Sequence, residues 1–252
     1  MQVEVRKKLK HRIDVRGAMI PNDYKWFYDW FDEDSTCPRD VFKVLSAAVP
    51  GDEIEVYINS PGGVIDVGSE IYTMLRGAAE KHDLHIYITG EACSAASIVA
   101  CAGYCEMSPT ALMMVHCVSS GARGNHSDME HMAEILRTAD QALCTAYTAK
   151  TGMSESDALE MMEHETWLTA QQAKERGLID KIMFQEEEKE PFVAAVNFKL
   201  PTNEQMAKVK AMMSETRKGE TQNEDAVKEA KMRARFLALT GRKNELTGGK
   251  TK

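Results

Sequence analysis

Short apolar runs alternate with amphipathic stretches through the middle of this 252-residue chain. Apolar, often β-branched runs at 54–58, 84–89 and 111–115 predict three strands. From Val64 to about Ala79, apolar residues recur at three- and four-residue steps, which predicts an amphipathic helix, and the small residues of 94–105 predict another. Strands that alternate with helices form largely parallel sheets with right-handed crossovers, so we expect an α/β domain.

The pattern is less regular on either side of this unit. Ile13–Val15 predicts a strand that ends at Gly17, and Arg39–Ala48 predicts a short helix. After the third strand, a Ser- and Gly-rich loop precedes a long helix predicted from about Ser127 to Lys150. The later elements are expected to be a helix at 154–162, an extended stretch at 167–168, a helix at 169–176 and a closing strand at 178–183.

Two further segments can be interpreted from composition. The chain becomes polar and charged from Gln185 onward, which predicts one domain over residues 1–190 and a polar, partly helical or disordered tail over 191–252. Near the N-terminus lies a cluster of aromatic residues that we interpret as lining the core, with a contact surface as the alternative: Tyr24, Trp26, Phe27, Tyr28 and Trp30.

The overall composition excludes several classes of protein. The net charge of −8 argues against a nucleic-acid binder, because phosphate contacts require a basic surface. No apolar run is long enough for a membrane span, and the N-terminus lacks the apolar core of a signal peptide, so we expect a cytoplasmic protein. The six cysteines show no paired metal-ligand spacing, so we expect reduced thiols and no metal site.

The most informative segments are 57–64 (Tyr-Ile-Asn-Ser-Pro-Gly-Gly-Val) and 90–97 (Gly-Glu-Ala-Cys-Ser-Ala-Ala-Ser). Each follows a predicted strand and opens a predicted helix. Side-chain-free glycines in the first expose backbone N–H groups, and the second places a hydroxyl at a helix start, where N–H groups are unpaired and the helix dipole favours an anion. Because sites in parallel sheets form beyond the carboxyl ends of strands, the two junctions together point to acyl transfer.

Serine hydrolysis needs a hydroxyl, a base, a group that orients the base, and donors for the tetrahedral oxyanion. Ser94 is the candidate nucleophile, although a Ser at a helix start is also an ordinary N-cap. His116 ends the third strand and is expected at the same sheet edge, where it is the candidate base or else a structural hydrogen-bonding residue. Glu165 is the candidate acid, with a solvated helix-end charge as the alternative.

The segment around Gly62 and Gly63 supplies a candidate oxyanion donor and a candidate edge for binding the substrate backbone. The backbone N–H groups of Gly63 and Ala95 are the candidate oxyanion donors, with an ordinary Pro-Gly turn as the alternative for the glycines. The segment Gly62, Gly63, Val64 and Ile65 is expected to pair with a substrate peptide in strand conformation. This chemistry uses side chains and backbone alone, so we expect no cofactor.

Residues from about Glu53 to Met183 resemble the Clp protease proteolytic subunit family. The resemblance is carried by segments 57–64 and 90–94, by Met-Met-Val-His at 113–116, and by the closing segment from Thr169-Ala170 to Gly177-Leu178-Ile179-Asp180. It implies a crotonase-like fold, Ser94 as nucleophile, His116 as base, and Gly63 and Ala95 as oxyanion donors. The family's third member is usually Asp, and Glu165 takes its place here.

Within this family, the chain is similar to phage and prophage proteases of the head-maturation type. Ser-Ala-Ala-Ser at 94–97, Glu-Thr-Trp at 165–167 and the long polar tail carry this similarity. It implies an endopeptidase that cleaves capsid or scaffold protein. It also implies a homo-oligomeric ring, commonly of seven subunits and sometimes stacked, with the long helix from Ser127 mediating contact between rings.

Three other functions stay open at the level of the sequence. One alternative is the proteolytic subunit of an ATP-dependent protease that works with an AAA+ unfoldase in general turnover. Acyl-CoA hydration or isomerisation uses the same fold but needs carboxylates near the oxyanion site rather than a Ser-His pair. A non-catalytic capsid-assembly component is disfavoured because each part of the machinery is present in the chain.

Overall fold

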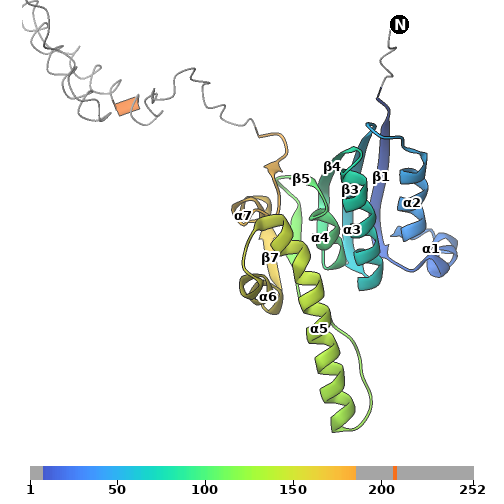
Figure 1. The fold of residues 1–252 in the computed structure, drawn as a ribbon, viewed down its shortest axis with the longest axis vertical. Coiled ribbons are helices and arrows are strands. Elements are labelled where there is room, and N and C mark those ends of the chain that lie inside the picture. The colour runs from blue at the N-terminus through green and yellow to red at the C-terminus, as the bar shows by residue number, and fades with distance from the viewer. Residues whose placement is uncertain (1–7, 186–206, 209–252) are drawn as a thin grey trace, which may run out of the picture. The chain divides into compact units, whose positions relative to one another are not determined.

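The computed structural model describes residues 8–185 and 207–208, and residues 8–185 form the domain shown in Figure 1. Its strands are β1 Lys10–Met19, β2 Ser35–Thr36, β3 Glu53–Gly63, β4 Asp83–Cys93, β5 Tyr104–Met107, β6 Leu112–Val115, β7 Thr166–Thr169 and β8 Lys181–Ile182. Its helices are the 3-10 turn η1 Asn22–Tyr24, α1 Lys25–Trp30, α2 Pro38–Ala47, α3 Ile65–Ala79, α4 Ala95–Ala100, α5 His126–Thr151, α6 Glu155–Glu163 and α7 Ala170–Glu175.

The strands form one sheet in the order β2-β1-β3-β4-β5-β8, and β6 joins it through β4. All these pairs are parallel, and β7 pairs antiparallel with β6 at the margin. The long strand β4 has two successive partners on one side: residues 85–88 pair with β5, and residues 91–93 pair with β6. The second half of β4 therefore holds β6 close to the start of α4.

The core lies between the sheet and the helices that cover it. Val56 pairs with Ile86 and Ile58 with Ile88, and all four side chains are fully buried. Helix α3 contributes the apolar stripe predicted from the sequence, with Val67, Ile71 and Leu75 buried. Figure 1 shows α3 and α4 against β3 and β4, with α2 beside β1, so this side of the central strands is shielded from solvent.

Helix α5 is the long helix predicted from the sequence, and it projects beyond the rest of the domain (Figure 1). Its start is fixed by a capping box, in which the side chain of Asn125 accepts from the backbone N–H groups of Ser127 and Asp128. It ends at Gly152, whose left-handed backbone (φ 75°) lets its N–H bond to the carbonyl of Thr148. The predicted β-α-β-α-β alternation is confirmed by β3, α3, β4, α4 and β6.

Three predicted boundaries were wrong. The first strand does not end at Gly17 but continues through it by a bulge, since Gly17 adopts φ 59° and a Cβ there would lie 1.8 Å from the carbonyl oxygen of Asp34. The helix predicted over 94–105 stops at Ala100, and residues 104–107 form β5 instead, where pairing with β4 overrides the helical pattern of small residues. Strand β8 is limited to Lys181–Ile182.

The aromatic cluster near the N-terminus does not line the core. Trp26 is 67% exposed and Trp30 is 79% exposed, and Tyr24 and Phe27 are exposed as well. Their short helix α1 lies beyond the end of β1 and makes its main contacts with η1 and the two-residue strand β2, which are too small to cover its rings. Burial of these rings requires a surface that the described part of the chain does not supply, so the contact-surface alternative fits the structure better.

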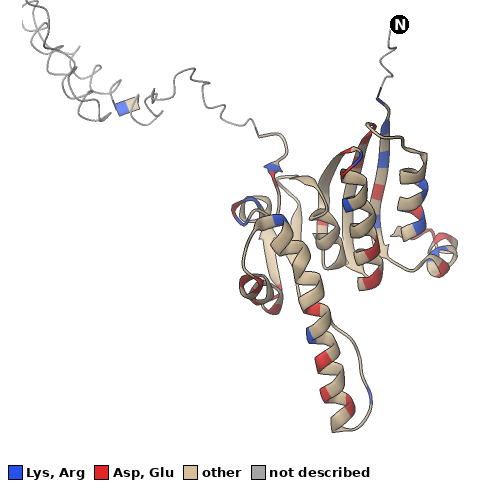
Figure 2. Ribbon diagram, in the orientation of Figure 1, with Lys and Arg blue, Asp and Glu red and all other residues tan. Residues whose placement is uncertain are grey.

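The predicted tail and the boundary near residue 190 lie outside the described residues, apart from residues 207–208, so they stay predictions. In the described part, Lys and Arg positions are interspersed with Asp and Glu rather than gathered in a stripe in the view of Figure 2. None of the helices in this part combines the length and the apolar character that crossing a membrane requires.

Candidate active site

Ser94 stands alone between the end of β4 and the start of α4. Its backbone has φ 54° and ψ −126°, which is uncommon for a residue with a Cβ. Such a sharp strand-to-helix turn raises a side chain above the carboxyl edge of a sheet, where a substrate can reach it. The N–H of Ser94 donates to the carbonyl of Met114 in β6 at 2.9 Å, so the turn is fixed to the strand that precedes His116.

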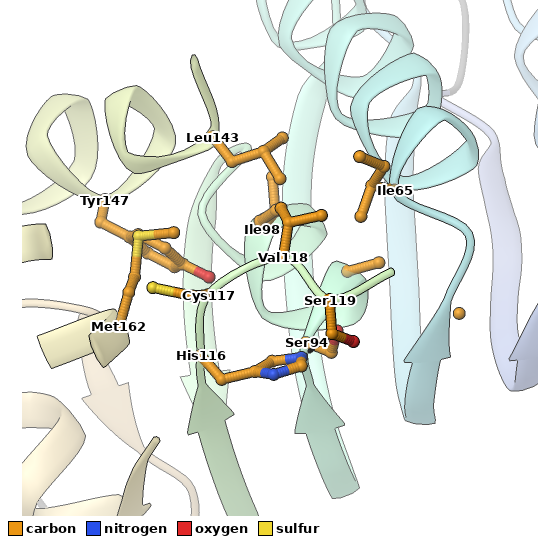
Figure 3. A pocket seen from close by; sticks show the side chains of 12 residues that line it. Ile65, Ser94, Ile98, His116, Cys117, Val118, Ser119, Leu143, Tyr147 and Met162 are labelled. Carbon is orange, nitrogen blue, oxygen red and sulfur yellow. Dashed lines mark hydrogen bonds between the residues drawn. The ribbon is translucent and has the colours of Figure 1, made fainter. Parts of the chain in front are cut away.

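His116 follows β6 directly, and the pairing of Cys93 with Met114 brings the ends of β4 and β6 together. The Nε2 atom of His116 lies 2.7 Å from the Oγ atom of Ser94, and Figure 3 shows the ring facing the hydroxyl. This separation is within the range required for a base that removes a hydroxyl proton. When Nε2 accepts from the hydroxyl, a neutral ring carries its own proton on Nδ1.

The two glycines at the end of β3 lie against this turn. A Cβ on Gly62 would lie 2.5 Å from the carbonyl oxygen of Cys93 and 2.7 Å from the Cβ of Ser94, so only glycine allows this approach. Ser60 anchors the segment, because its Oγ accepts from the N–H of Gly62 at 3.1 Å and donates to the carbonyl of Gly17 at 2.6 Å. Gly63 and Ala95, the predicted oxyanion donors, line one pocket with Ser94 and His116.

Glu165 is placed opposite His116 by the backbone but not by its side chain. In the antiparallel pair of β6 and β7, Val115 is opposite Thr166, so the next residues outward are His116 and Glu165. The carboxylate of Glu165 is exposed, and its Oε1 accepts from the indole N–H of Trp167 at 3.3 Å. Among the described residues no hydrogen bond joins Glu165 to His116. The structure therefore brings Ser94 and His116 together, while the side chain of Glu165 contacts Trp167 instead of His116.

The predicted substrate-pairing segment 62–65 spans the end of β3 and the start of α3. The N–H of Val64 donates to the carbonyl of Met19 at 2.9 Å, and its carbonyl accepts from the N–H of Gly68 at 3.2 Å. Ile65 is already the first residue of α3. Both polar backbone groups of Val64 are thus occupied within the chain, so pairing with a substrate strand stays a prediction for Gly62 and Gly63 alone.

A small pocket of about 70 Å³ opens beside the serine (Figure 3). Its wall combines apolar side chains with polar groups and comes from the three helices α3, α4 and α5, from the end of α6 and from the segment after His116. The lining residues beyond those already described are Ile65, Ile98, Cys117, Val118, Ser119, Leu143, Tyr147 and Met162. A pocket beside a candidate nucleophile can hold a side chain of a substrate.

Comparison with known proteins assigns the fold and the family. The family model for Clp protease matches residues 36–186, which is more than half of the chain. The chain belongs to the Clp protease family. Two relatives from strains of Bacteroides fragilis, each named ATP-dependent Clp protease proteolytic subunit, are 33% identical to it over 142 residues. The matched region spans 55% of this chain and 68% and 64% of those relatives.

Membership confirms the predicted resemblance and the crotonase-like α/β fold, and it implies a hydrolase of peptide bonds. Members of the Clp protease family usually form oligomeric rings. The family model begins at residue 36, so β1 and the aromatic helix α1 lie outside the matched region of this Clp protease. Among the described residues, no group of three or more His, Cys, Asp or Glu side chains is arranged to hold a metal ion.

Asp140 on α5 is a residue of this Clp protease that the sequence did not single out. Its side chain is 9% exposed, and its Oδ1 accepts from the N–H of Val118 at 2.7 Å. The N–H of Cys117 donates to the carbonyl of Met162 at 3.1 Å. The segment after His116 is therefore held by α5 and α6. An acidic residue in the middle of an amphipathic helix gives no signal of this contact in the sequence.

Cys117 is a second nucleophilic group in the pocket, but it is protonated. Burial raises the pKa of its thiol to about 11, with the carboxylate of Asp140 as a further cause. A raised pKa means that less thiolate is present at neutral pH, so the group is a poor nucleophile there. Burial likewise raises the pKa of Cys93, which precedes Ser94, to about 12. Neither thiol is therefore an activated nucleophile at neutral pH, which leaves Ser94 as the candidate nucleophile.

We predict slow alkylation of Cys117 at neutral pH. Its pKa of about 11 should make its reaction with iodoacetamide at pH 7.5 slower than that of free glutathione by roughly 100-fold or more. Between pH 8 and 10, the rate should rise about tenfold per pH unit as thiolate forms. Mass spectrometry of the modified Cys117 peptide over time measures this rate. A rate that levels off below pH 9 would contradict the assignment.

Proposed function

We propose that this Clp protease is a serine endopeptidase in which Ser94 attacks the scissile carbonyl. The observation that carries the proposal is the 2.7 Å contact between Ser94 Oγ and His116 Nε2 at the mouth of a pocket. His116 takes the serine proton as the hydroxyl attacks and returns it to the leaving amine. Water then hydrolyses the acyl-enzyme with the same histidine as base.

The tetrahedral intermediate carries a negative charge on the former carbonyl oxygen. We propose that the N–H groups of Gly63 and Ala95 donate to that oxygen, because both residues line the pocket beside Ser94. Ala95 is the first residue of α4, where an N–H has no acceptor within the helix. The pocket wall combines apolar side chains with polar groups, and its small volume supports a preference for a small or medium side chain next to the scissile bond.

A fluorophosphonate probe tests the activity directly, because it phosphonylates an activated serine. We expect one label per chain, with mass spectrometry of the digest assigning it to the peptide that contains Ser94. The variant Ser94→Ala should take up no label. Absence of labelling in the wild type, or equal labelling of Ser94→Ala, would refute the proposed serine peptidase.

We propose Glu165 as the third member of the triad, although its carboxylate contacts Trp167 in the structure. The proposal is supported by the pairing of Val115 with Thr166, which makes Glu165 and His116 the next residues along their two segments. We propose that a change of side-chain rotamer brings the carboxylate to the Nδ1 side of the ring. Catalytic hydrogen bonds are often incomplete in a resting enzyme and form only when the substrate binds. The missing bond between Glu165 and His116 is therefore compatible with the proposed role.

Glu165→Gln should lower kcat/KM for a peptide substrate by about 100-fold, less than removal of Ser94 or His116, because the acid acts through the histidine. Glu165→Asp is the matched variant, since it keeps the charge and shortens the side chain by one methylene. It should retain more activity than Glu165→Gln. If Glu165→Gln kept the wild-type kcat/KM, Glu165 would not be the third member of the triad. Asp140→Asn would then be the next variant to measure.

Capsid or scaffold protein is our proposed substrate, acted on by a homo-oligomeric ring during phage or prophage head maturation. The proposal is supported by the Ser-Ala-Ala-Ser and Glu-Thr-Trp segments and the long polar tail. The second candidate, the proteolytic subunit of an ATP-dependent protease that works with an AAA+ unfoldase, is favoured by the names of the Bacteroides fragilis relatives.

Incubation with a candidate capsid protein separates the two candidates. The head-maturation protease should cut this protein at defined sites without ATP or an unfoldase, while Ser94→Ala should leave it intact. Cleavage that requires an added unfoldase and ATP would support the second candidate. Normal capsid assembly with Ser94→Ala, in the absence of any cleavage, would instead support a non-catalytic assembly role.

A further inference from the structure

The carbonyl group of Ser94 is held by two donors from a single residue. Ser97 donates to it from its backbone N–H at 2.9 Å and from its Oγ at 2.6 Å. The Ser97 side chain is fully buried, and its Oγ also lies 2.8 Å from the hydroxyl of Tyr147 on α5. A three-residue chain of hydrogen bonds thus runs from the long helix to the nucleophile turn.

The direction of each hydrogen bond in this chain follows from the groups present. A carbonyl oxygen can only accept, so the single hydroxyl proton of Ser97 is used toward Ser94. Tyr147 must therefore donate to the Oγ of Ser97. Burial raises the pKa of Tyr147, so its hydroxyl keeps the proton that this role needs at neutral and moderately alkaline pH.

These hydrogen bonds from Tyr147 through Ser97 also fix the orientation of the peptide unit between Ser94 and Ala95. A trans peptide is planar, and its C=O and N–H point in opposite directions. Holding the Ser94 oxygen on the side of Ser97 therefore directs the Ala95 N–H to the other side. That N–H is one of the two proposed oxyanion donors, and the positive φ of Ser94 means that this orientation needs support.

We propose that Ser97 and Tyr147 are positioning residues that aim the Ala95 N–H at the oxyanion of the tetrahedral intermediate. The inference rests on the proposed serine peptidase activity and adds two residues to it. Neither residue touches the reacting atoms: Tyr147 acts through Ser97, and Ser97 acts through the Ser94–Ala95 peptide. Helix α5 thereby contributes to transition-state stabilisation from outside the triad.

The variants Ser97→Ala, Tyr147→Phe and the double variant test the proposal in the full-length protein. An oxyanion interaction forms only in the transition state, so kcat should fall while KM stays within about threefold. Loss of a complete oxyanion donor costs about 10²–10³ in kcat, and a misdirected one should cost less, about 10- to 30-fold in Ser97→Ala. Tyr147→Phe should lose less, because it acts one step further away.

A peptide boronic acid supplies a readout that a merely structural role would not change. Its boron accepts Ser94 Oγ to form a tetrahedral adduct that places an oxygen in the oxyanion site. Its inhibition constant should therefore weaken in Ser97→Ala by about the same factor as kcat. Because Tyr147 acts through Ser97, the double variant should be no worse than Ser97→Ala, rather than showing the product of the two effects.

Thr36→Val is the matched control, because it also removes a buried hydroxyl that bonds to backbone, at Arg16, but in β2 away from the serine. It should reduce thermal stability and leave boronate inhibition unchanged. If Ser97→Ala fails to fold, kcat and boronate inhibition are compared between Tyr147→Phe and the wild type instead. Wild-type kcat and boronate affinity in Ser97→Ala, with an active wild type, would overturn this inference alone. A wild type that neither hydrolyses peptides nor reacts with fluorophosphonate would overturn the proposed function and this inference together.

Discussion

Replacing Ser94 by Ala is expected to lower kcat/KM for peptide hydrolysis by about 10⁴- to 10⁶-fold, the largest effect of any single substitution in this chain. The substitution removes the atom that forms the acyl-enzyme and leaves His116 without the partner now 2.7 Å away. Initial rates on a fluorogenic peptide, together with single-turnover detection of the acyl-enzyme, measure the loss. The unfolding temperature should change little, because the hydroxyl contacts the ring of a partly exposed histidine.

Two further variants serve as a comparison and a control for Ser94→Ala. His116→Ala should cost about as much as Ser94→Ala, and the double variant should be no worse than either, because the two residues act as one unit. Ser69→Ala removes an exposed serine on α3 and should retain wild-type rates. A Ser94→Ala protein that keeps even one-tenth of the wild-type rate would show that another residue is the nucleophile.

Outside the Ser94–His116 pair, Gly62→Ala should have the largest effect, combining lost activity with lost stability. Gly62 adopts φ 93°, a region that a residue with a Cβ rarely enters. The added carbon would also meet the carbonyl oxygen of Cys93 at 2.5 Å and the Cβ of Ser94 at 2.7 Å, so the nucleophile turn must shift. We expect a loss of about 2–4 kcal/mol in the free energy of unfolding and of about 100-fold or more in kcat.

Gly77→Ala is the matched glycine control. Gly77 lies within α3, and a Cβ there would meet no atom within 4 Å. The substitution should raise the free energy of unfolding by about 0.5–1 kcal/mol, because alanine favours a helix interior, and should leave kcat unchanged. Urea unfolding and peptide hydrolysis, measured on both variants, separate the two effects. Unchanged kcat in Gly62→Ala would show that the position of the serine turn does not depend on this glycine.

The sequence predicted the residues that stand at the ends of strands. Ser94 and His116 each follow an apolar run, and parallel strands bring their carboxyl ends to one edge, so their proximity could be anticipated from local patterns alone. Glu165 was also a candidate from the sequence, and along the backbone it follows on from the pairing of Val115 with Thr166, opposite His116. The direction of its side chain depends on rotamer choice and on the nearby Trp167, and neither is encoded in a periodic pattern.

Contacts between distant segments could not be predicted in this way. Tyr147 and Asp140 appear in the sequence as ordinary positions of a long helix, and their roles arise only when α5 packs against α4 and the segment after His116. The aromatic residues of α1 were assigned to the core because large apolar side chains are usually buried, but their helix folds outside the layered part of the domain. Strand β5 was missed because its pairing with β4 outweighs the local helical pattern of small residues.

The shared use of β4 has a consequence for how activity emerges during folding. The first half of this strand aligns with β5, and its last three residues align with β6, so one slip in register would displace nucleophile and base together. A misaligned chain would keep most of its helices and much of its apolar interior, yet it would be chemically inert. The proposed reactivity of Ser94 is therefore a stringent marker that non-local strand alignment has been completed.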